Sequence, residues 1–117
     1  MGIRKPREGD LVKQCLQWLQ LHGIVAWRMN SGRLPTTYKG KQRLVSFHGM
    51  PGLSDVIGIL PKGRFLACEI KQPGNSPTLL QKSFLDLVNA AGGLGICVHS
   101  LDDLIRALEL ERAVRHG

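Results

Sequence analysis

Two apolar segments joined by a three-residue turn constrain the fold of this chain more than any other feature. Residues 55–60 and 64–71 are almost continuously apolar, and they flank Pro61-Lys62-Gly63. A short connection with Gly at its end is typical of a β-hairpin. Strands this apolar are typically buried on both faces of a sheet. The sequence therefore predicts two adjacent antiparallel strands at the centre of a sheet.

The same hairpin predicts that three charged residues converge at its open end. If residues 61–63 form the loop, Leu60 faces Arg64, and counting outwards places Asp55 opposite Glu69. Directly opposed side chains have Cβ atoms about 5 Å apart. Lys71 lies two residues beyond Glu69 and therefore on the same face of the sheet. A bulge in either strand would shift this register by one residue.

Two opposed carboxylates repel each other, by about 3 kcal/mol at an effective dielectric constant of about 20. A divalent cation such as Mg²⁺ or Mn²⁺ would offset the repulsion, because hard cations prefer oxygen ligands. The predicted ligands are Asp55, Glu69 and the backbone carbonyl of Ile70. Lys71 would then orient or deprotonate an attacking water, or stabilise developing negative charge. The alternative is a cross-strand salt bridge on a solvated face, which the apolar character of both strands disfavours.

Three further segments have the apolar periodicity of helices. The first is Glu8–Leu21. The second is predicted to begin at Ser76-Pro77, with Ser as N-cap and Pro at the first helical position, and to end at Gly92-Gly93. Its predicted apolar stripe consists of Leu80, Phe84, Leu87, Val88 and Ala91. The third follows a capping-box pattern at Ser100 and Asp103 and extends to about Val114.

Alternating or apolar runs predict strands at Val25–Asn30 and Leu94–His99, and a short one at Leu44–Phe47. Residues 31–42 are polar and are predicted to form a basic loop that can include a short hairpin. The predicted core order is α-β-β-β-α-β-α. This is an α/β fold with a mixed sheet flanked by helices, in a single domain over residues 1–117.

The distribution of charge predicts a polyanionic partner. The net charge is +7, and the residues from Leu11 to Ser54 include six basic residues and no acidic one. A basic face of this kind favours nucleic acid. The candidate contacts to the DNA backbone are donors and cations along this region and on the second helix. They are Arg28, Asn30, Ser31, Arg33, Lys39, Lys41, Arg43, His48 and Lys82.

Several other classes of protein are disfavoured. The sequence contains neither a membrane-spanning apolar run nor a secretory signal, so a cytoplasmic location is expected. The three cysteines lack the spacing of a zinc site or of a disulfide framework. No His is placed to activate a Ser or Cys nucleophile, and no organic cofactor is expected.

The motifs Gly52-Leu-Ser-Asp55 and Glu69-Ile-Lys71, followed by Gln81, resemble the PD-(D/E)XK nuclease superfamily. More closely, they are similar to the stand-alone VRR-NUC domain of phage and bacterial proteins, from Glu8 to about Leu104. The resemblance implies a restriction-endonuclease-like fold. It also implies an active site in which Glu8, on the first helix, and Gln81 join Asp55, Glu69 and Lys71, with Glu8 also near the metal.

The resemblance further implies a Mg²⁺- or Mn²⁺-dependent endodeoxyribonuclease. Branched, flap or four-way-junction DNA would be the substrate, and the enzyme would act as a homodimer in a bacterial or phage-infected cytoplasm. Two departures exist: Ser54 replaces the Pro that commonly precedes the Asp, and the nearest counterpart of the Val-Arg-Arg motif is Val98-His99-Ser100. The alternatives are a non-catalytic basic DNA-binding module, or a nuclease of the same superfamily that acts on RNA or as a restriction enzyme.

Overall fold

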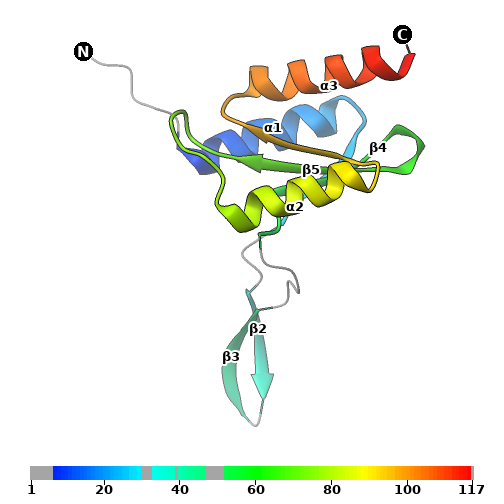
Figure 1. The fold of residues 1–117 in the computed structure, drawn as a ribbon. Helices are drawn as coiled ribbons and strands as arrows, with labels where there is room; N and C mark the ends of the chain where they lie inside the picture. The colour runs from blue at the N-terminus through cyan, green and yellow to red at the C-terminus, as the bar shows by residue number, and fades with distance from the viewer. Residues whose placement is uncertain (1–6, 30–32, 39, 47–51, 117) are drawn as a thin grey trace.

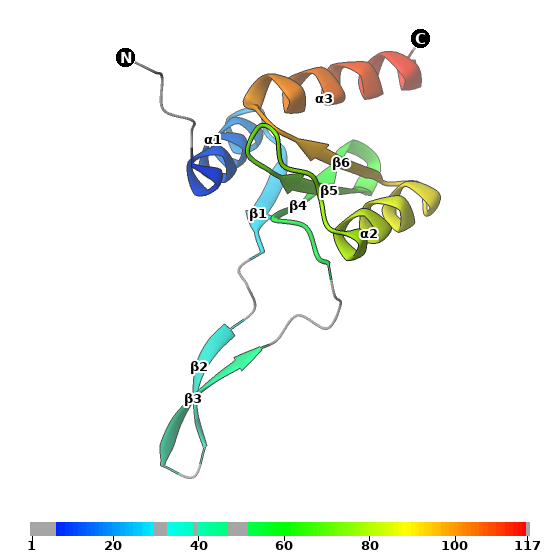
Figure 2. The ribbon, with the colours of Figure 1, turned by 60° about the vertical axis from the view of Figure 1, so that its left-hand side comes forward.

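The computed structural model describes residues 7–29, 33–38, 40–46 and 52–116. Its core is a four-stranded sheet with the strand order β1-β4-β5-β6 (Figure 1 and Figure 2). The strands are β1 (Val25–Arg28), β4 (Val56–Leu60), β5 (Arg64–Ile70) and β6 (Leu94–Val98). Neighbours pair antiparallel except for β5 and β6, which are parallel. With the three helices, the core follows the predicted order α-β-β-β-α-β-α.

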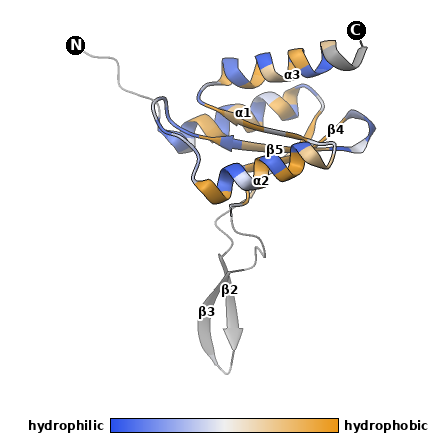
Figure 3. Cartoon of the chain, viewed as in Figure 1, coloured by the Kyte–Doolittle hydropathy of each residue, from blue (hydrophilic) through white to orange (hydrophobic). Residues whose placement is uncertain are grey.

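The helices cover the sheet on both faces, as the alternation of apolar and polar residues along them predicts (Figure 3). Helices α1 (Glu8–Leu21) and α3 (Leu101–His116) pack on one face, and α2 (Leu79–Ala90) on the other. Four residues of α1 are buried: Leu11, Val12, Cys15 and Leu19. Burial of one such aliphatic side chain contributes roughly 1.5–3 kcal/mol. No helix in the described part of the chain is long and apolar enough to cross a membrane.

The central hairpin has the predicted register, with Leu60 opposite Arg64 and Val56 opposite Cys68. In the turn Pro61–Gly63, Gly63 adopts a φ of 77°. One expectation about this hairpin was wrong. Ile59 and Phe65 face each other near the turn, yet they are 46% and 42% exposed. The reason is that α2 packs against β6 and β5, so it leaves this part of the sheet open.

Helix α2 begins later than predicted. Its N-cap is Thr78, not Ser76, and Thr78 forms a capping box with Gln81. The predicted apolar stripe was confirmed for Phe84 and Val88 but wrong for Leu80 and Leu87, which are 59% and 53% exposed. The buried residues of the helix are Phe84, Leu85 and Val88. Gly95 in β6 explains why α2 turns its Leu85 side toward the sheet. A Cβ on Gly95 would lie 2.5 Å from the carbonyl oxygen of Leu85, so the helix can approach β6 this closely only because residue 95 has no side chain.

The start of α3 only half matches the predicted capping box. The Ser100 hydroxyl accepts a hydrogen bond of 3.1 Å from the backbone N–H of Asp103. The Asp103 carboxylate accepts from the N–H of His99, at 2.9 Å, and not from the cap residue itself. The preceding strand β6 is at the edge of the sheet, so only Val98 is buried within it.

A two-stranded hairpin forms outside the core. Strands β2 (Arg33–Tyr38) and β3 (Lys41–Ser46) pair antiparallel in a sheet of their own, which we call the arm. The arm projects away from the core between β1 and β4 (Figure 2). A hairpin was anticipated within residues 31–42, but it extends further than predicted, because the strand predicted at 44–47 begins at Lys41 and pairs with β2. Polar strands lack the apolar alternation from which strand bounds are predicted.

Candidate active site

The predicted convergence of charged residues occurs at the open end of the central hairpin. Asp55 immediately precedes β4, Glu69 is the penultimate residue of β5, and Lys71 follows that strand. The register Val56–Cys68 places Asp55 beside Glu69. The backbone N–H of Ile70 donates a hydrogen bond of 2.9 Å to Oδ2 of Asp55. By strand alternation, Glu69 lies on the face of the sheet that α2 covers.

Glu69 is the one charged residue buried in the core among those described, with 1% of its surface exposed. Its Oε1 lies 3.9 Å from Nζ of Lys71, which is a long ion pair. Its Oε2 is buried without a hydrogen-bond partner. A buried polar atom without a partner is energetically costly, so a native protein normally supplies one. The position of this oxygen therefore suits a bound cation.

The electrostatics of the pair support the same conclusion. Burial raises the pKa of Glu69 to about 8, and the charge of Asp55 and a hydrogen bond to its carboxyl group add to the effect. Lys71 lowers that pKa, and Glu8 raises it slightly. The protein's own groups thus leave Glu69 largely neutral at pH 7. A divalent cation would favour the ionised form far more strongly than one distant ammonium.

The donor set fits Mg²⁺ or Mn²⁺ better than a metal that needs a full protein cage. In the described part of the chain, no three His, Cys, Asp or Glu side chains cluster in a way that could hold a metal ion. Asp55 and Glu69 provide two carboxylates, and Ile70 provides a backbone carbonyl between them and Lys71. Mg²⁺ usually binds through one or two carboxylates and keeps several waters. This arrangement is sufficient for such an ion.

Glu8 and Gln81, the two further predicted site residues, differ in their relation to the carboxylates. Glu8 is the first residue of α1 and is close enough for its charge to act on Glu69. The side-chain oxygen of Gln81 accepts a 2.8 Å hydrogen bond from the N–H of Thr78, so it caps α2. The chain segment before Asp55 nevertheless contacts this turn. A Cβ on Gly52 would lie 2.4 Å from the carbonyl oxygen of Leu80 and 2.8 Å from the backbone nitrogen of Gln81.

The predicted DNA contacts are distributed over separate elements. Arg28 is exposed at the end of β1, but its partner Val56 faces α1, so Arg28 lies on the face opposite Glu69. Lys82 is exposed in the first turn of α2. Arg33, Lys41 and Arg43 belong to the arm. Four of the predicted contacts lie outside the described residues: Asn30, Ser31, Lys39 and His48.

Two neighbours of the site were not predicted. Cys97 is the partner of Glu69 across the parallel pair β5–β6, and burial together with the charge of Glu69 raises the pKa of its thiol. Ser54, next to Asp55, is 1% exposed and its hydroxyl oxygen has no hydrogen-bond partner. The pairing of Cys97 depends on a crossover through α2, which leaves no local signal in the sequence. Ser54 could have been recognised as a neighbour of the site from the sequence, because it replaces the Pro that commonly precedes the Asp in the PD-(D/E)XK motif.

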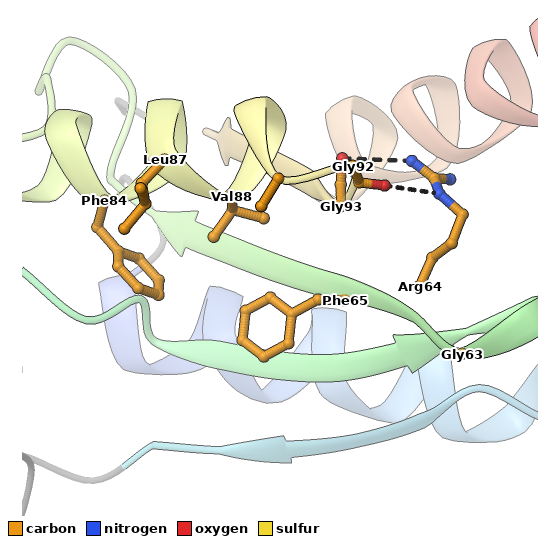
Figure 4. Close-up of a pocket in the computed structure, with 9 residues that line it drawn as sticks. Gly63, Arg64, Phe65, Phe84, Leu87, Val88, Gly92 and Gly93 are labelled. Carbon is orange, nitrogen blue, oxygen red and sulfur yellow. Dashed lines mark hydrogen bonds between the residues drawn. The ribbon is translucent and has the colours of Figure 1, made fainter.

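A shallow apolar hollow of about 480 Å³ lies at the other end of β5 (Figure 4). Phe65, Phe84 and Leu87 line it, and Arg64 closes one side by donating hydrogen bonds to the carbonyls of Gly92 and Gly93. Glu69 is four residues from Phe65, or roughly 13 Å along the strand. The hollow contains no acid or base in its lining beyond Arg64, so it is separate from the carboxylate site.

Comparisons with known proteins support the architecture. No family model matches the sequence, and no curated protein matches it. The structure is similar to a solved structure described as a VRR_NUC domain, with a TM-score of 0.61 and 19% sequence identity. The similarity covers 87% of this chain and 94% of that one. The chain therefore has the fold of a VRR_NUC domain, with a restriction-endonuclease-like core.

Proposed function

We propose that this protein is a metal-dependent DNA endonuclease whose active site consists of Asp55, Glu69 and Lys71. The observation that carries the proposal is the state of Glu69. It is buried opposite a second carboxylate, with one oxygen that has no partner and an ammonium 3.9 Å from the other. A purely structural salt bridge would not leave a buried carboxylate oxygen unsatisfied. The VRR_NUC fold supports the same function.

Asp55, Glu69 and the carbonyl of Ile70 would hold Mg²⁺ or Mn²⁺. The ion would supply Lewis-acid chemistry for phosphodiester hydrolysis. The hydrogen bond from Ile70 N–H holds Asp55 in place before any ligand binds. The Lys71 side chain is 15% exposed, so its ammonium can reach a phosphate oxygen or an attacking water from within the site. Lys71 would stabilise the negative charge that develops on the phosphate.

We further propose that Glu8 and Gln81 assist this site. The charge of Glu8 already acts on Glu69, and it would help to attract a cation. Gln81 retains a side-chain amide group that can donate to a water or phosphate while its oxygen caps α2. Lys82, exposed one residue further on, would contact the DNA backbone. The same role is proposed for the other predicted contacts in the basic region between Leu11 and Ser54.

We also propose a homodimer and a branched DNA substrate. Cutting both strands of a four-way junction symmetrically needs two active sites related by a two-fold axis. A candidate surface for association exists on the open part of the α2-side face. Val25, Ile59 and Phe65 lie in register across three strands and are 60%, 46% and 42% exposed, and Trp27 beside them is 42% exposed. A contiguous apolar patch of this kind supports contact with a second copy.

The test is a cleavage panel on linear duplex, flap, splayed-arm and four-way-junction DNA, with Mg²⁺, Mn²⁺ and EDTA. We expect metal-dependent cleavage, fastest on a branched substrate. A Glu69→Gln variant, which keeps the size of the side chain, is the matched control and should not cut. If the wild-type protein cuts no DNA with either metal but binds it, the protein is a DNA-binding module. Cleavage of RNA alone would assign it to the RNA-directed alternative.

A further inference from the structure

The arm lies in the sequence between two core segments that meet at the candidate active site. It is inserted between β1 and Asp55, and the backbone N–H of Met29, next after β1, donates a 2.8 Å hydrogen bond to the carbonyl of Asp55. Met29, the last described residue before the arm, therefore lies beside Asp55, a carboxylate of the site. The arm forms no strand pairing with the core sheet. An element inserted between these two core segments is suited to contact a ligand that extends out of the site.

The register of the arm divides its residues between two faces. Paired residues in an antiparallel sheet share a face, and the face alternates along each strand. One face combines the pairs Thr36–Arg43 and Tyr38–Lys41 at the tip with Leu34–Val45 at the base. The other face combines Arg33–Ser46, Pro35–Leu44 and Thr37–Gln42. The register thus puts two cations and the only tyrosine of the chain at neighbouring positions of one face.

We propose that this tip face, formed by positions 36, 38, 41 and 43, binds the duplex DNA that flanks the cleavage site. The proposal rests on the proposed nuclease function and assigns a separate binding element to it. Lys and Arg neutralise phosphates, and hydroxyl groups of Thr and Tyr donate hydrogen bonds to phosphate oxygens. A two-stranded ribbon also has the width that the major groove of B-DNA accepts. Among the paired residues of the arm, the opposite face has no cation near the tip.

The length of the arm determines how far from the cut it would act. Each strand has six residues, and at about 3.4 Å per residue they extend roughly 17 Å. With about 3.4 Å of rise per base pair, this equals roughly five base pairs of duplex. The tip would therefore contact phosphates about five base pairs beyond those at the arm's base. Substrates too short to reach the tip should not benefit from it.

The test measures how DNA affinity depends on salt for three double variants, in EDTA so that no cleavage occurs. Lys41→Ala/Arg43→Ala removes both cations of the tip face. Lys13→Ala/Arg106→Ala removes two exposed cations from α1 and α3, on the far side of the sheet. Thr37→Ala/Gln42→Ala alters the opposite face of the arm. The probe is a duplex with a single flap and flanks of about twelve base pairs, compared with flanks of about three.

We expect the salt dependence of DNA affinity to change only in the tip-face variant, Lys41→Ala/Arg43→Ala. Two lost phosphate contacts lower the slope of log affinity against log salt by about 1.8, so the loss of affinity between about 50 and 200 mM salt becomes roughly tenfold smaller. On the short-flank probe the tip-face variant and wild type should bind alike. Equal slopes for wild type and the tip-face variant on the long probe would overturn the proposal. So would an equal effect of the α1/α3 variant.

Failure of the arm assignment can be distinguished from failure of the nuclease proposal. If wild-type protein cuts the flap substrate with Mg²⁺ while the tip-face variant keeps the wild-type salt slope, the nuclease proposal holds and the arm assignment fails. If wild type cuts nothing but the slope changes as expected, the arm binds DNA and the nuclease proposal fails. Circular dichroism and the melting temperature of each variant check that the core remains folded, since the arm lies outside it.

Discussion

Asp55 and Ile70 are linked by a 2.9 Å hydrogen bond in which the carboxylate of Asp55 accepts from the backbone N–H of the residue after Glu69. The link sets the spacing of the two acids independently of any ligand. The hydrogen bond occupies Oδ2 of Asp55. Burial, and next the negative charge of Asp55 held at this spacing, oppose the ionisation of Glu69 and raise its pKa.

Asp55→Asn should abolish cleavage without unfolding the protein. The amide keeps the shape of the side chain and can still accept from Ile70, but it removes the charge that a cation needs. We expect cleavage to fall by at least about a hundredfold. The melting temperature in EDTA at pH 7.5 should not fall, because the charge that opposes ionisation of Glu69 is gone. If this variant retained Mg²⁺-dependent cleavage, Asp55 would not be an active-site residue.

Lys71→Met should separate chemistry from binding. Methionine preserves most of the aliphatic stem but lacks the ammonium that lies 3.9 Å from Glu69. Cleavage should fall by at least about a hundredfold, with DNA affinity within a few-fold of wild type. Single-turnover cleavage and binding in EDTA measure the two quantities. A parallel loss of affinity would mean that Lys71 mainly binds DNA.

The metal-free protein should lose stability as the pH rises from about 4.5 to about 8. The pKa of Glu69 is raised from 4.5 to about 8 in the folded state, so within this window the folded protein holds a proton that the unfolded chain has released. The free energy of unfolding therefore decreases with rising pH. Melting temperatures in EDTA should show this decrease in wild type and less of it in Glu69→Gln. Identical pH profiles would argue against the raised pKa.

Binding of Mg²⁺ should depend on pH in the opposite sense. Because the cation requires an ionised Glu69, binding releases a proton while the pH is below the raised pKa, about 8. The apparent affinity should then rise by up to about tenfold per pH unit and level off above that pH. Calorimetric titration in two buffers of different ionisation enthalpy measures the released proton. Titration of Asp55→Asn with Mg²⁺ serves as the control for ions bound elsewhere.

Gly52→Ala should weaken the contact between the Asp55 segment and α2. Gly52 has a φ of 78°, and an added Cβ would lie 2.4 Å from a carbonyl oxygen of the first turn of α2. We expect a loss of about 1–3 kcal/mol in unfolding free energy together with reduced cleavage. Gly74→Ala is the matched control, since Gly74 also has a positive φ, 92°, but no atom within 4 Å of the added Cβ. Equal losses in both variants would show that backbone strain alone is responsible.

Trp27→Glu should convert the proposed dimer to a monomer. Trp27 lies in β1 on the exposed apolar patch, and a charge there would be buried without a partner in any association. Analytical ultracentrifugation should show the smaller species, and a junction substrate should be nicked on one strand only. Leu110→Glu, at a 69% exposed leucine of α3, should leave the mass unchanged. A monomeric wild type would exclude the dimer directly.

The predictions from sequence were confirmed where they depended on local geometry. The convergence of Asp55 and Glu69 required only the loop length and the register of one hairpin, and α1 from Glu8 to Leu21 followed from periodicity and its ends. The start of α2 was missed because Ser76 and Thr78 are both acceptable caps. The orientation of α2 was missed because the contact at Gly95 that decides it joins separate elements. A hairpin in the arm was anticipated, but the bounds of its strands were missed because polar strands carry a weak apolar pattern.

The sequence by itself determined the central hairpin, the face and spacing of Asp55, Glu69 and Lys71, and the excess of positive charge before Ser54. These properties follow from strand alternation and turn length, which act between near neighbours. Tertiary structure alone decided the burial of Glu69 to 1% exposure, its raised pKa and the approach of Glu8. Desolvation depends on which helices cover a sheet, and that packing joins residues that are distant in the chain.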